Sequence, residues 1–208
     1  MSRQLTPKKE ENLLNTSQFI PIKLHESPGS KTAQRNLTGY PRIIRDLSAD
    51  IFNDIQQWNG LHIRGAKIIK EIASLKATTY KQSHYPPELE PLCNNVLEVV
   101  NALEIIVESL KAISKKMSPI VNLHKSNTPL FISWPTSKFV LTAEKIANVY
   151  AEELDLKRTI CENIAHSKDE EEATFHAVTW AVQPFIENDV NIALESLLTE
   201  TGHRSIGK

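Results

Sequence analysis

The sequence is poor in the residues and motifs on which most catalytic and nucleotide-binding folds depend. Its 208 residues include only six glycines and two cysteines. It contains no glycine-rich phosphate-binding loop, no Gly-x-Ser-x-Gly turn, and no kinase or ATPase motif. With so few glycines, a fold that alternates strands with tight turns has little from which to build its turns. We therefore expect a protein that is not an enzyme.

The cysteines and the hydrophobic runs exclude further classes. Cys93 and Cys161 lie far apart and outside any Cys-x-x-Cys spacing, so we predict neither a zinc site nor a disulfide framework. No apolar run approaches the roughly 18 residues needed to cross a bilayer, and the first residues lack the apolar run of a signal peptide. We expect an intracellular protein, in the cytosol or nucleus, that does not contact a membrane.

One pattern typical of a metal site is present but incomplete. A di-metal carboxylate site in a helical bundle needs the spacing Glu-x-x-His twice, on facing helices. Only Glu200 and His203 have this spacing, and Gly202 between them interrupts the helix that would aim both ligands. Two other Glu and His pairs are separated by one residue too many. We therefore expect no metal and no cofactor.

Charge is distributed unevenly along the chain. Residues 1–45 hold eight Lys and Arg against three Asp and Glu, which gives +5, whereas the remainder holds sixteen against twenty-two, which gives −6. A basic tail on an acidic body can fold back onto it, or can contact an acidic partner or nucleic acid. No basic face interleaved with aromatic residues accompanies the tail, so direct binding of nucleic acid is the alternative rather than the main expectation.

Residues 1–42 are predicted to form a disordered tail, because they show no sustained period and cannot bury enough apolar area to offset chain entropy. Thr6-Pro7-Lys8-Lys9 has the Ser/Thr-Pro-x-Lys/Arg form preferred by proline-directed cyclin-dependent kinases, and Ser27-Pro28 is an incomplete version. Thr6 and Ser27 are therefore candidate phosphorylation sites, with a plain tail as the alternative. A phosphate at Thr6 would add nearly two negative charges beside two lysines.

Apolar periodicity predicts an all-α fold over residues 43–205, an antiparallel, coiled-coil-like bundle of long helices. The first helix is expected over about 44–79, and the second over about 88–117, where Pro119 stops it. Extra apolar residues widen the seam of the second helix, so a second surface of it is covered by another helix or by a partner. That seam alternates steps of three and four without a break: Leu89, Leu92, Val96, Val99, Leu103, Ile106, Leu110, Ile113 and Met117.

Residues 118–135 are predicted to be a loop with an unusually apolar sequence, because Leu130, Phe131 and Trp134 lie in it. Loops normally carry polar residues, since their backbone must stay hydrated. The loop therefore either packs back on the bundle or is held for a partner. Thr136 or Ser137 is expected to cap the helix that follows.

The C-terminal half is predicted to contain three further helices, at about 136–166, 169–183 and 187–201. Pro184 should end the second of these, and Gly202 the third.

The charged residues of the 136–166 helix, among them Glu153, Lys157 and Arg158, are interpreted as a solvated face. Three apolar side chains of the C-terminal half are expected in the core: Ile146, Trp180 and Leu194.

Five short segments resemble the cyclin-dependent kinase 2-interacting protein family. They are Pro129-Leu130-Phe131-x-x-Trp134-Pro135-Thr136-x-x-Phe139, Glu153-Leu154-x-Leu156-Lys157-Arg158-Thr159, Ala165-His166, Gln183-Pro184-x-x-Glu187 and Leu194-Glu195-Ser196-x-Leu198-x-Glu200-Thr201-Gly202-His203-Arg204. The segments occur in order and with compatible spacing over residues 129–204. Residues 44–117 resemble the family only as helices of similar length.

The resemblance implies a small nuclear adaptor with neither catalytic activity nor a cofactor. The family is associated with cyclin-dependent kinase 2 and the Cdc7 kinase at replication complexes, and with the ATR checkpoint module, which implies roles in the cell cycle, DNA replication and DNA repair. It also implies a subunit of an AAA+ ATPase assembly that acts in ribosomal large-subunit maturation and replisome protein turnover, paired with a second small helical protein. The alternative function is a nucleic-acid-proximal factor that uses its basic tail.

The candidate partner-binding residues come from the apolar loop, the middle of the following helix and the C-terminal segment. Structural roles in loop packing, helix surface charge and helix capping are the alternative for each of them. They are Leu130, Phe131, Trp134, Pro135, Phe139, Leu154, Lys157, Arg158, Glu195, Thr201, Gly202, His203 and Arg204.

Overall fold

The computed structural model describes residues 37–79, 85–124 and 129–205. Over these ranges the chain contains helices and no β-strand, as the all-α prediction expected. The candidate phosphorylation sites Thr6 and Ser27 lie outside the described residues, as does nearly all of the predicted tail. The helices are α1 (Tyr40–Thr79), α2 (Leu89–Leu123), α3 (Thr136–Asn163), the short 3-10 helix η2 (Ile164–His166), α4 (Glu170–Val182) and α5 (Asn188–Glu200).

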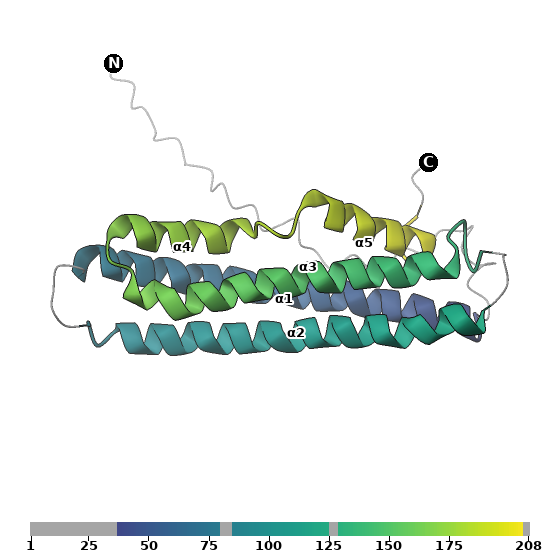
Figure 1. Cartoon of the computed structure of the whole chain (residues 1–208), viewed down its shortest axis with the longest axis horizontal. Helices are drawn as coiled ribbons and strands as arrows, with labels where there is room; N and C mark the ends of the chain where they lie inside the picture. The colour runs from purple at the N-terminus through teal and green to yellow at the C-terminus, as the bar shows by residue number, and fades with distance from the viewer. Residues whose placement is uncertain (1–36, 80–84, 125–128, 206–208) are drawn as a thin grey trace, which may run out of the picture. The chain divides into compact units, whose positions relative to one another are not determined.

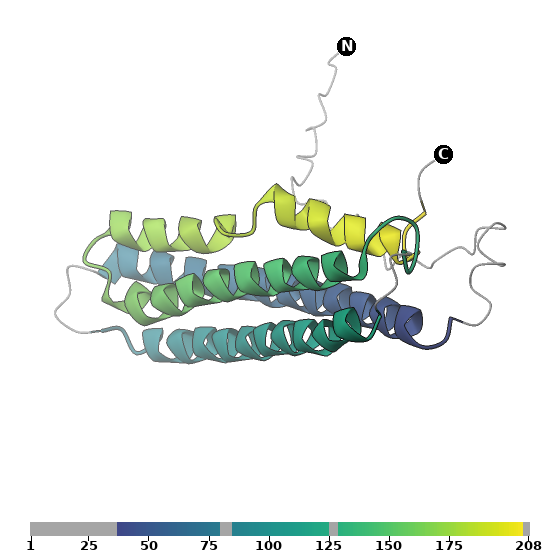
Figure 2. The ribbon, with the colours of Figure 1, turned by 45° about the vertical axis from the view of Figure 1, so that its right-hand side comes forward.

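The three long helices α1, α2 and α3 alternate in direction, so that α2 runs antiparallel to both α1 and α3 and packs against both of them (Figure 1). After η2 the chain reverses, and α4 and α5 run back along the bundle, end to end, as a broken fourth helix (Figures 1 and 2). In this outer layer α4 packs mainly on α1, and α5 mainly on α3. The predicted antiparallel bundle is confirmed.

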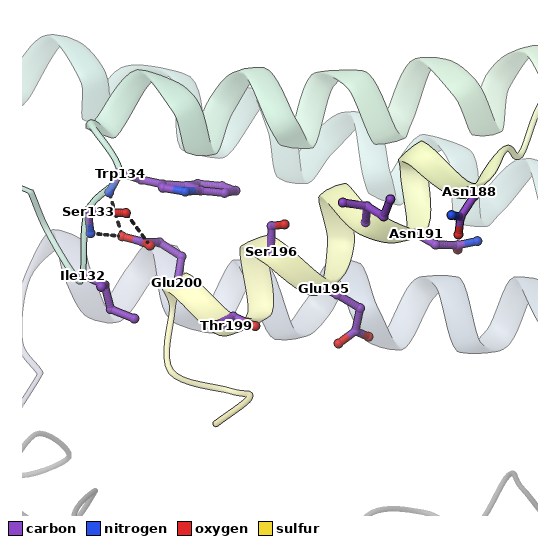
Figure 3. Close-up of a pocket in the computed structure, with 10 residues that line it drawn as sticks. Ile132, Ser133, Trp134, Asn188, Asn191, Glu195, Ser196, Thr199 and Glu200 are labelled. Carbon is purple, nitrogen blue, oxygen red and sulfur yellow. Dashed lines mark hydrogen bonds between the residues drawn. The ribbon is translucent and has the colours of Figure 1, made fainter. Parts of the chain in front are cut away.

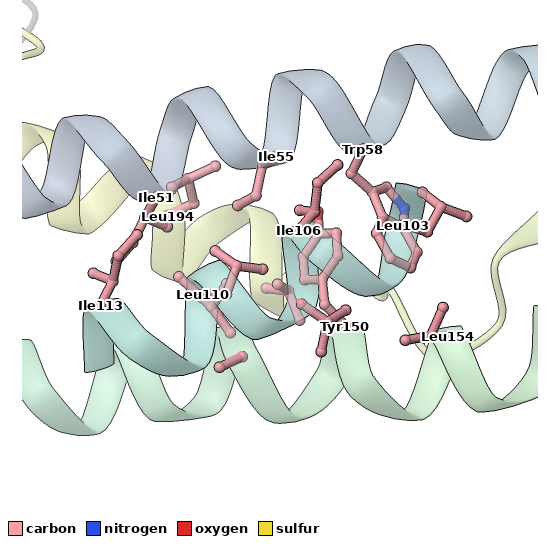
Figure 4. Close-up of a cluster of buried hydrophobic side chains, with 14 of the residues drawn as sticks. Ile51, Ile55, Trp58, Leu103, Ile106, Leu110, Ile113, Tyr150, Leu154 and Leu194 are labelled. Atoms are coloured by element: carbon pink, nitrogen blue, oxygen red, sulfur yellow. The ribbon is translucent and has the colours of Figure 1, made fainter. Parts of the chain in front are cut away.

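The core follows the predicted seam of α2. Every residue of that seam is buried except Leu92, which is half-buried. Figure 4 shows Leu103, Ile106 and Leu110 of α2 pointing into a cluster that receives side chains from α1, α3 and α5. Of the four extra apolar residues of this helix, Val100 and Val107 are buried, because α2 has one neighbour on each side of its seam. Leu97 and Ile105 are 50% and 71% exposed, so the predicted cover extends to only half of them.

The N-terminal boundary of the bundle differs from the prediction. The first helix begins at Tyr40, four residues before the expected start, where Gly39 has φ +69° and its carbonyl accepts a hydrogen bond from Ile43 N (3.2 Å). Pro41 therefore falls in the first turn of α1, where its missing N–H has no partner to lose.

The prediction that Pro119 stops the second helix is wrong. α2 continues through Pro119 to Leu123. A proline within a helix removes one hydrogen bond, but packing offsets this loss, because Ile120, the next residue, is buried in the core. The helix then ends where His124 N donates to the Ile120 carbonyl at 2.8 Å. The loop before α3 is correspondingly shorter than predicted.

The ends of the later helices mostly agree with the sequence. α4 ends at Val182, just before Pro184, and Gln183 adopts a left-handed conformation at φ 52°. Past the end of α5, Gly202 has φ +76° and His203 N donates to the Leu198 carbonyl at 2.8 Å, which is a glycine-terminated C-cap. Both predicted stops are confirmed.

The prediction of a side-chain cap for α3 is wrong. Its N-cap position is Pro135, and no side chain accepts a hydrogen bond there; Thr136 is the first helical residue.

Candidate partner-binding site

A groove lies between the segment that precedes α3 and the outer face of α5 (Figure 3). It has a volume of about 600 Å³ and is open to solvent. Ile132 and Ile192 are each more than half exposed beside it, whereas its other lining groups are amides, hydroxyls and carboxylates, apart from the Trp134 ring. The lining residues are Ile132, Ser133, Trp134, Asn188, Asn191, Ile192, Glu195, Ser196, Thr199 and Glu200.

Glu200, the last residue of α5, ties the two walls of this groove together. Its carboxylate accepts hydrogen bonds from Ser133 N and from Trp134 N (2.7 Å), and from Ser133 Oγ (3.1 Å), as Figure 3 shows. Because the carboxylate is buried, these charge-assisted bonds fix the loop on the end of α5. The sequence identified Glu200 as part of a motif but did not assign this contact.

Aromatic packing completes the attachment of the loop. The Trp134 ring lies 5.3 Å from the Phe139 ring of α3 between centroids, and the Phe131 ring lies 5.5 Å from the same Phe139 ring. Lys138 places its Nζ 4.2 Å above the Trp134 ring. Phe139 is fully buried and Trp134 is 9% exposed. Of the two alternatives for the loop, packing on the bundle is therefore realised in this structure.

The C-terminal residues also make contacts within the bundle. His203 Nε2 donates to the Arg45 carbonyl of α1 at 2.8 Å. Arg204 Nε bonds Glu195 at 3.2 Å, and its guanidinium lies 5.1 Å from the Phe52 ring centre. The segment from Leu194 to Arg204, which resembles the family's C-terminal sequence, therefore connects α5 to α1 and to the loop.

The structure brings two of the three predicted groups of site residues together. The loop residues and the C-terminal residues meet at one end of the bundle through the Glu200 contacts. Leu154, Lys157 and Arg158 lie further along α3; from Phe139 to Lys157 the helix rises about 27 Å. Direct contact of the candidate residues with a partner stays a prediction, and five of them are buried in the bundle: Trp134, Phe139, Leu154, Lys157 and Thr201.

A fully buried ion pair replaces part of the predicted solvated face of α3. Lys157 Nζ lies 3.1 Å from Glu153 Oε1, and neither side chain is exposed. Lys157 Nζ also donates to the Trp180 carbonyl of α4 (3.1 Å) and approaches His62 Nδ1 of α1 at 3.3 Å. The interpretation of Glu153 and Lys157 as solvated charges is wrong.

This pair joins three helices and the break between α4 and α5. Glu153 Oε2 accepts from Phe185 N (3.2 Å), and Lys157 Nζ lies 4.3 Å above the Trp180 ring. The Trp180 ring in turn donates through Nε1 to the His62 carbonyl at 3.2 Å. A polar cluster thus anchors an outer helix whose fully buried side chains are only Ala173 and Trp180.

Burial dominates the electrostatics of this cluster. It lowers the pKa of Lys157 to about 8, and the neighbouring Glu153 carboxylate limits the drop. It raises the pKa of Glu153, which Lys157 and Phe185 N oppose. The pKa of His62 falls to about 4, first through burial and then through the Lys157 charge. His62 is therefore neutral near pH 7, and its Nδ1 can accept a hydrogen bond from Lys157.

The sequence contained a signal for this buried pair. The inner face of α3 reads Ile146, Tyr150, Glu153, Lys157 and Ile160, with steps of four, three, four and three. Both charged residues thus occupy positions that a coiled-coil seam reserves for apolar side chains.

Arg158 matches the surface interpretation more closely. It bonds Glu104 of α2 at 2.6 Å and Asp155 at 2.9 Å, with its side chain 37% exposed.

The described residues show neither a metal centre nor a membrane-spanning element. Within them no three His, Cys, Asp or Glu side chains are grouped so that they could hold a metal ion. None of the described helices combines the length and the apolar character needed to span a bilayer. Cys93 and Cys161 are both free and half-buried, and burial raises the pKa of each thiol.

The fold and the groove define the class: a helical bundle protein that offers a mixed polar and apolar surface groove. The chain is 30% identical to a Homo sapiens cyclin-dependent kinase 2-interacting protein over 192 residues, which are 79% of this chain and 91% of that protein. The Xenopus laevis protein of that name is 29% identical over 87% of this chain and 99% of its own length, and the Bos taurus protein is 30% identical over 78% and 90%. No model of a known protein family matches the chain. The chain belongs to the cyclin-dependent kinase 2-interacting protein family.

Proposed function

We propose that this chain is a non-catalytic adaptor that binds cyclin-dependent kinase 2 through the groove between the Trp134 loop and α5. The observation that carries the proposal is the pair Ile132 and Ile192, two large apolar side chains exposed beside a hollow of about 600 Å³. Interfaces between proteins depend on a few apolar anchors that enter such hollows, with polar groups at the rim. The names of the relatives supply the kinase as the first partner to test.

The rigidity of the groove supports this assignment. Three hydrogen bonds from Ser133 and Trp134 to the Glu200 carboxylate fix one wall on the other. A preformed site loses less conformational entropy on binding than a mobile loop would. The wall residues can therefore present their exposed side chains to a partner without a prior folding step.

The proposal extends to the cellular setting that the resemblance implies. The adaptor would act in the nucleus, where it would link the replication and checkpoint kinases, Cdc7 and the ATR module included, to DNA replication. It would also serve as a subunit of an AAA+ ATPase assembly in ribosomal large-subunit maturation and replisome protein turnover, beside a second small helical protein. These partners rest on the family resemblance and not on the groove.

The test is capture of partners from nuclear extract by the tagged full chain, with quantitative mass spectrometry. The groove variant carries Ile132→Asp and Ile192→Asp, and the control carries Ile105→Asp, an isoleucine on α2 that is more exposed than either of them. Surface substitutions of this kind leave folding nearly unchanged. We expect the groove variant to recover at least tenfold less kinase than the other two chains. Equal recovery by all three would contradict a role of the groove.

A further inference from the structure

The outward face of α4 carries an uncovered apolar stripe. Phe175, Val178 and Val182 are 65%, 54% and 66% exposed, and Phe185 just beyond the helix is 43% exposed. On a helix, steps of three and four residues place side chains on one face. α4 lies in the outer layer of the bundle (Figures 1 and 2), and this face is directed away from the buried Trp180.

The spacing of the stripe indicates what kind of element would cover it. Within α4, Glu171, Phe175, Val178 and Val182 follow one another in steps of four, three and four. This is the heptad spacing that a second helix packs against, as it does in the seam of α2. A helix is therefore a better fit to this face than an extended strand or a small molecule.

The charge around the stripe indicates which sign of charge that helix should carry. From Asp169 to Gly202 the chain contains eight acidic residues and no lysine or arginine. Five of the eight belong to α4 or to the residues that flank it, whereas Asp189 and Glu195 pair with Lys145 and Arg204, and Glu200 is buried. Glu170 and Glu171 are exposed at the start of the stripe, and Glu187 is exposed just past its end. A partner with lysine or arginine beside its apolar seam would complement both ends, whereas an acidic partner would be repelled.

We propose that α4 docks a basic amphipathic helix of another protein along Phe175, Val178 and Val182. A second copy of this chain fits less well, because pairing of two such faces brings acidic residues from both copies together with no basic residue between Asp169 and Gly202 to separate them. This surface is separate from the groove, so the inference goes beyond the proposed function and does not rest on it.

The chain's own N-terminal segment is the other occupant to consider. Residues 1–36 carry six basic and three acidic residues, which gives +3. Prolines interrupt this segment, however, and the run between Pro7 and Pro21 holds two lysines and two glutamates. A stretch of that composition lacks the excess of basic charge that the α4 face requires.

The test is a titration of the purified full chain with two synthetic helical peptides of about three heptads. Both carry leucine at the seam positions; the flanking positions are lysine in one peptide and glutamate in the other. Fluorescence anisotropy should give at least tenfold tighter binding of the lysine peptide. Phe175→Asp with Val182→Asp should weaken that binding at least tenfold, and Ile105→Asp on α2 should leave it unchanged. Equal affinity for the two peptides, or binding that survives the α4 substitutions, would overturn the proposal.

A second measurement separates the other occupants. A photoreactive residue at position 178 of the purified full chain should form no crosslink on its own and should crosslink to the added lysine peptide. A crosslink to residues 1–36 of the same chain, or to a second copy, would replace the proposed partner by that occupant and overturn the proposal. Neither measurement involves the kinase, so a negative result leaves the proposed function of the groove untouched.

Discussion

Glu153 and Lys157, one turn apart on α3, form an ion pair 3.1 Å long in which neither side chain is exposed to solvent. The pair fixes the outer layer of the bundle, because Lys157 bonds the Trp180 carbonyl and Glu153 accepts from Phe185 N. The cost of desolvating two charges offsets much of their attraction. The pair therefore acts more to position α4 on the bundle than to raise the free energy of unfolding.

Removal of one charge from this pair should be far more damaging than removal of both. Lys157→Met leaves a buried carboxylate without its counter-charge, which costs about 3–5 kcal/mol in such sites. The double variant Glu153→Gln/Lys157→Met removes both charges and keeps an acceptor for Phe185 N. Urea unfolding should therefore place the double variant above Lys157→Met in stability. A double variant less stable than the single one would show that the pair itself stabilises the fold.

The His62 imidazole should make stability depend on pH in the acid range. Its pKa is about 4 in the folded chain and 6.5 ordinarily, so the unfolded chain binds more protons between these values. The free energy of unfolding therefore rises as pH increases from about 4 to 6.5. Below about pH 4, the destabilisation caused by protonation of His62 has reached its full value. His62→Gln removes the titration. The loss of unfolding free energy between pH 7 and pH 4.5 should be smaller in the variant than in the parent chain. An equal loss in both would assign the acid sensitivity to other groups.

Two glycines of α1 should respond in opposite directions to the same substitution. A Cβ on Gly65 would overlap the Trp180 ring and lie 2.9 Å from its Cε2, whereas nothing lies within 4 Å of one on Gly60. Alanine within a helix is favoured over glycine by about 0.5–1 kcal/mol, so Gly60→Ala should stabilise the chain by that amount. Gly65→Ala should destabilise it by about 1–3 kcal/mol, because Trp180 must move. Thermal unfolding of the two variants measures both effects, and a stabilising Gly65→Ala would contradict the close packing of α4 on α1.

Glu200→Ala should release the Trp134 loop from α5. The change leaves the Ser133 and Trp134 amides without their acceptor, and hydrogen bonds to charged groups contribute about 1.5–3 kcal/mol. Hydrogen exchange at these two amides should accelerate markedly. Glu195→Ala, on the same helix and bonded to Arg204, is the matched control and should leave both amides protected. Unchanged protection in Glu200→Ala would mean that aromatic packing alone fixes the loop.

The bundle could be predicted from periodicity because α2 has an unbroken apolar seam. Gly202 and Pro184 could be placed as helix stops because their backbone preferences are local. Pro119 could not be read in this way, since packing of the next residue, Ile120, outweighs the preference of proline to end a helix.

The interior of the candidate site was harder to predict for a different reason. Glu153 and Lys157 were interpreted as exposed because charged residues are seldom fully buried. Their burial depends on α4, which reaches them only after the chain reverses at η2. The Glu200 contacts depend in the same way on residues 66 and 67 positions earlier in the chain. The local sequence pattern can single out such residues, but only the tertiary fold determines which groups they contact.

The most direct test of the account is a calorimetric titration of purified cyclin-dependent kinase 2 into three full-length chains: the parent, Ile132→Asp/Ile192→Asp and Ile105→Asp. We predict that the parent and the α2 control bind the kinase with the same affinity, and that the groove variant binds at least tenfold more weakly while unfolding at the same temperature. Binding that is equal in all three chains, or absent from the parent, would contradict the claim that this groove is the kinase-binding site of the adaptor.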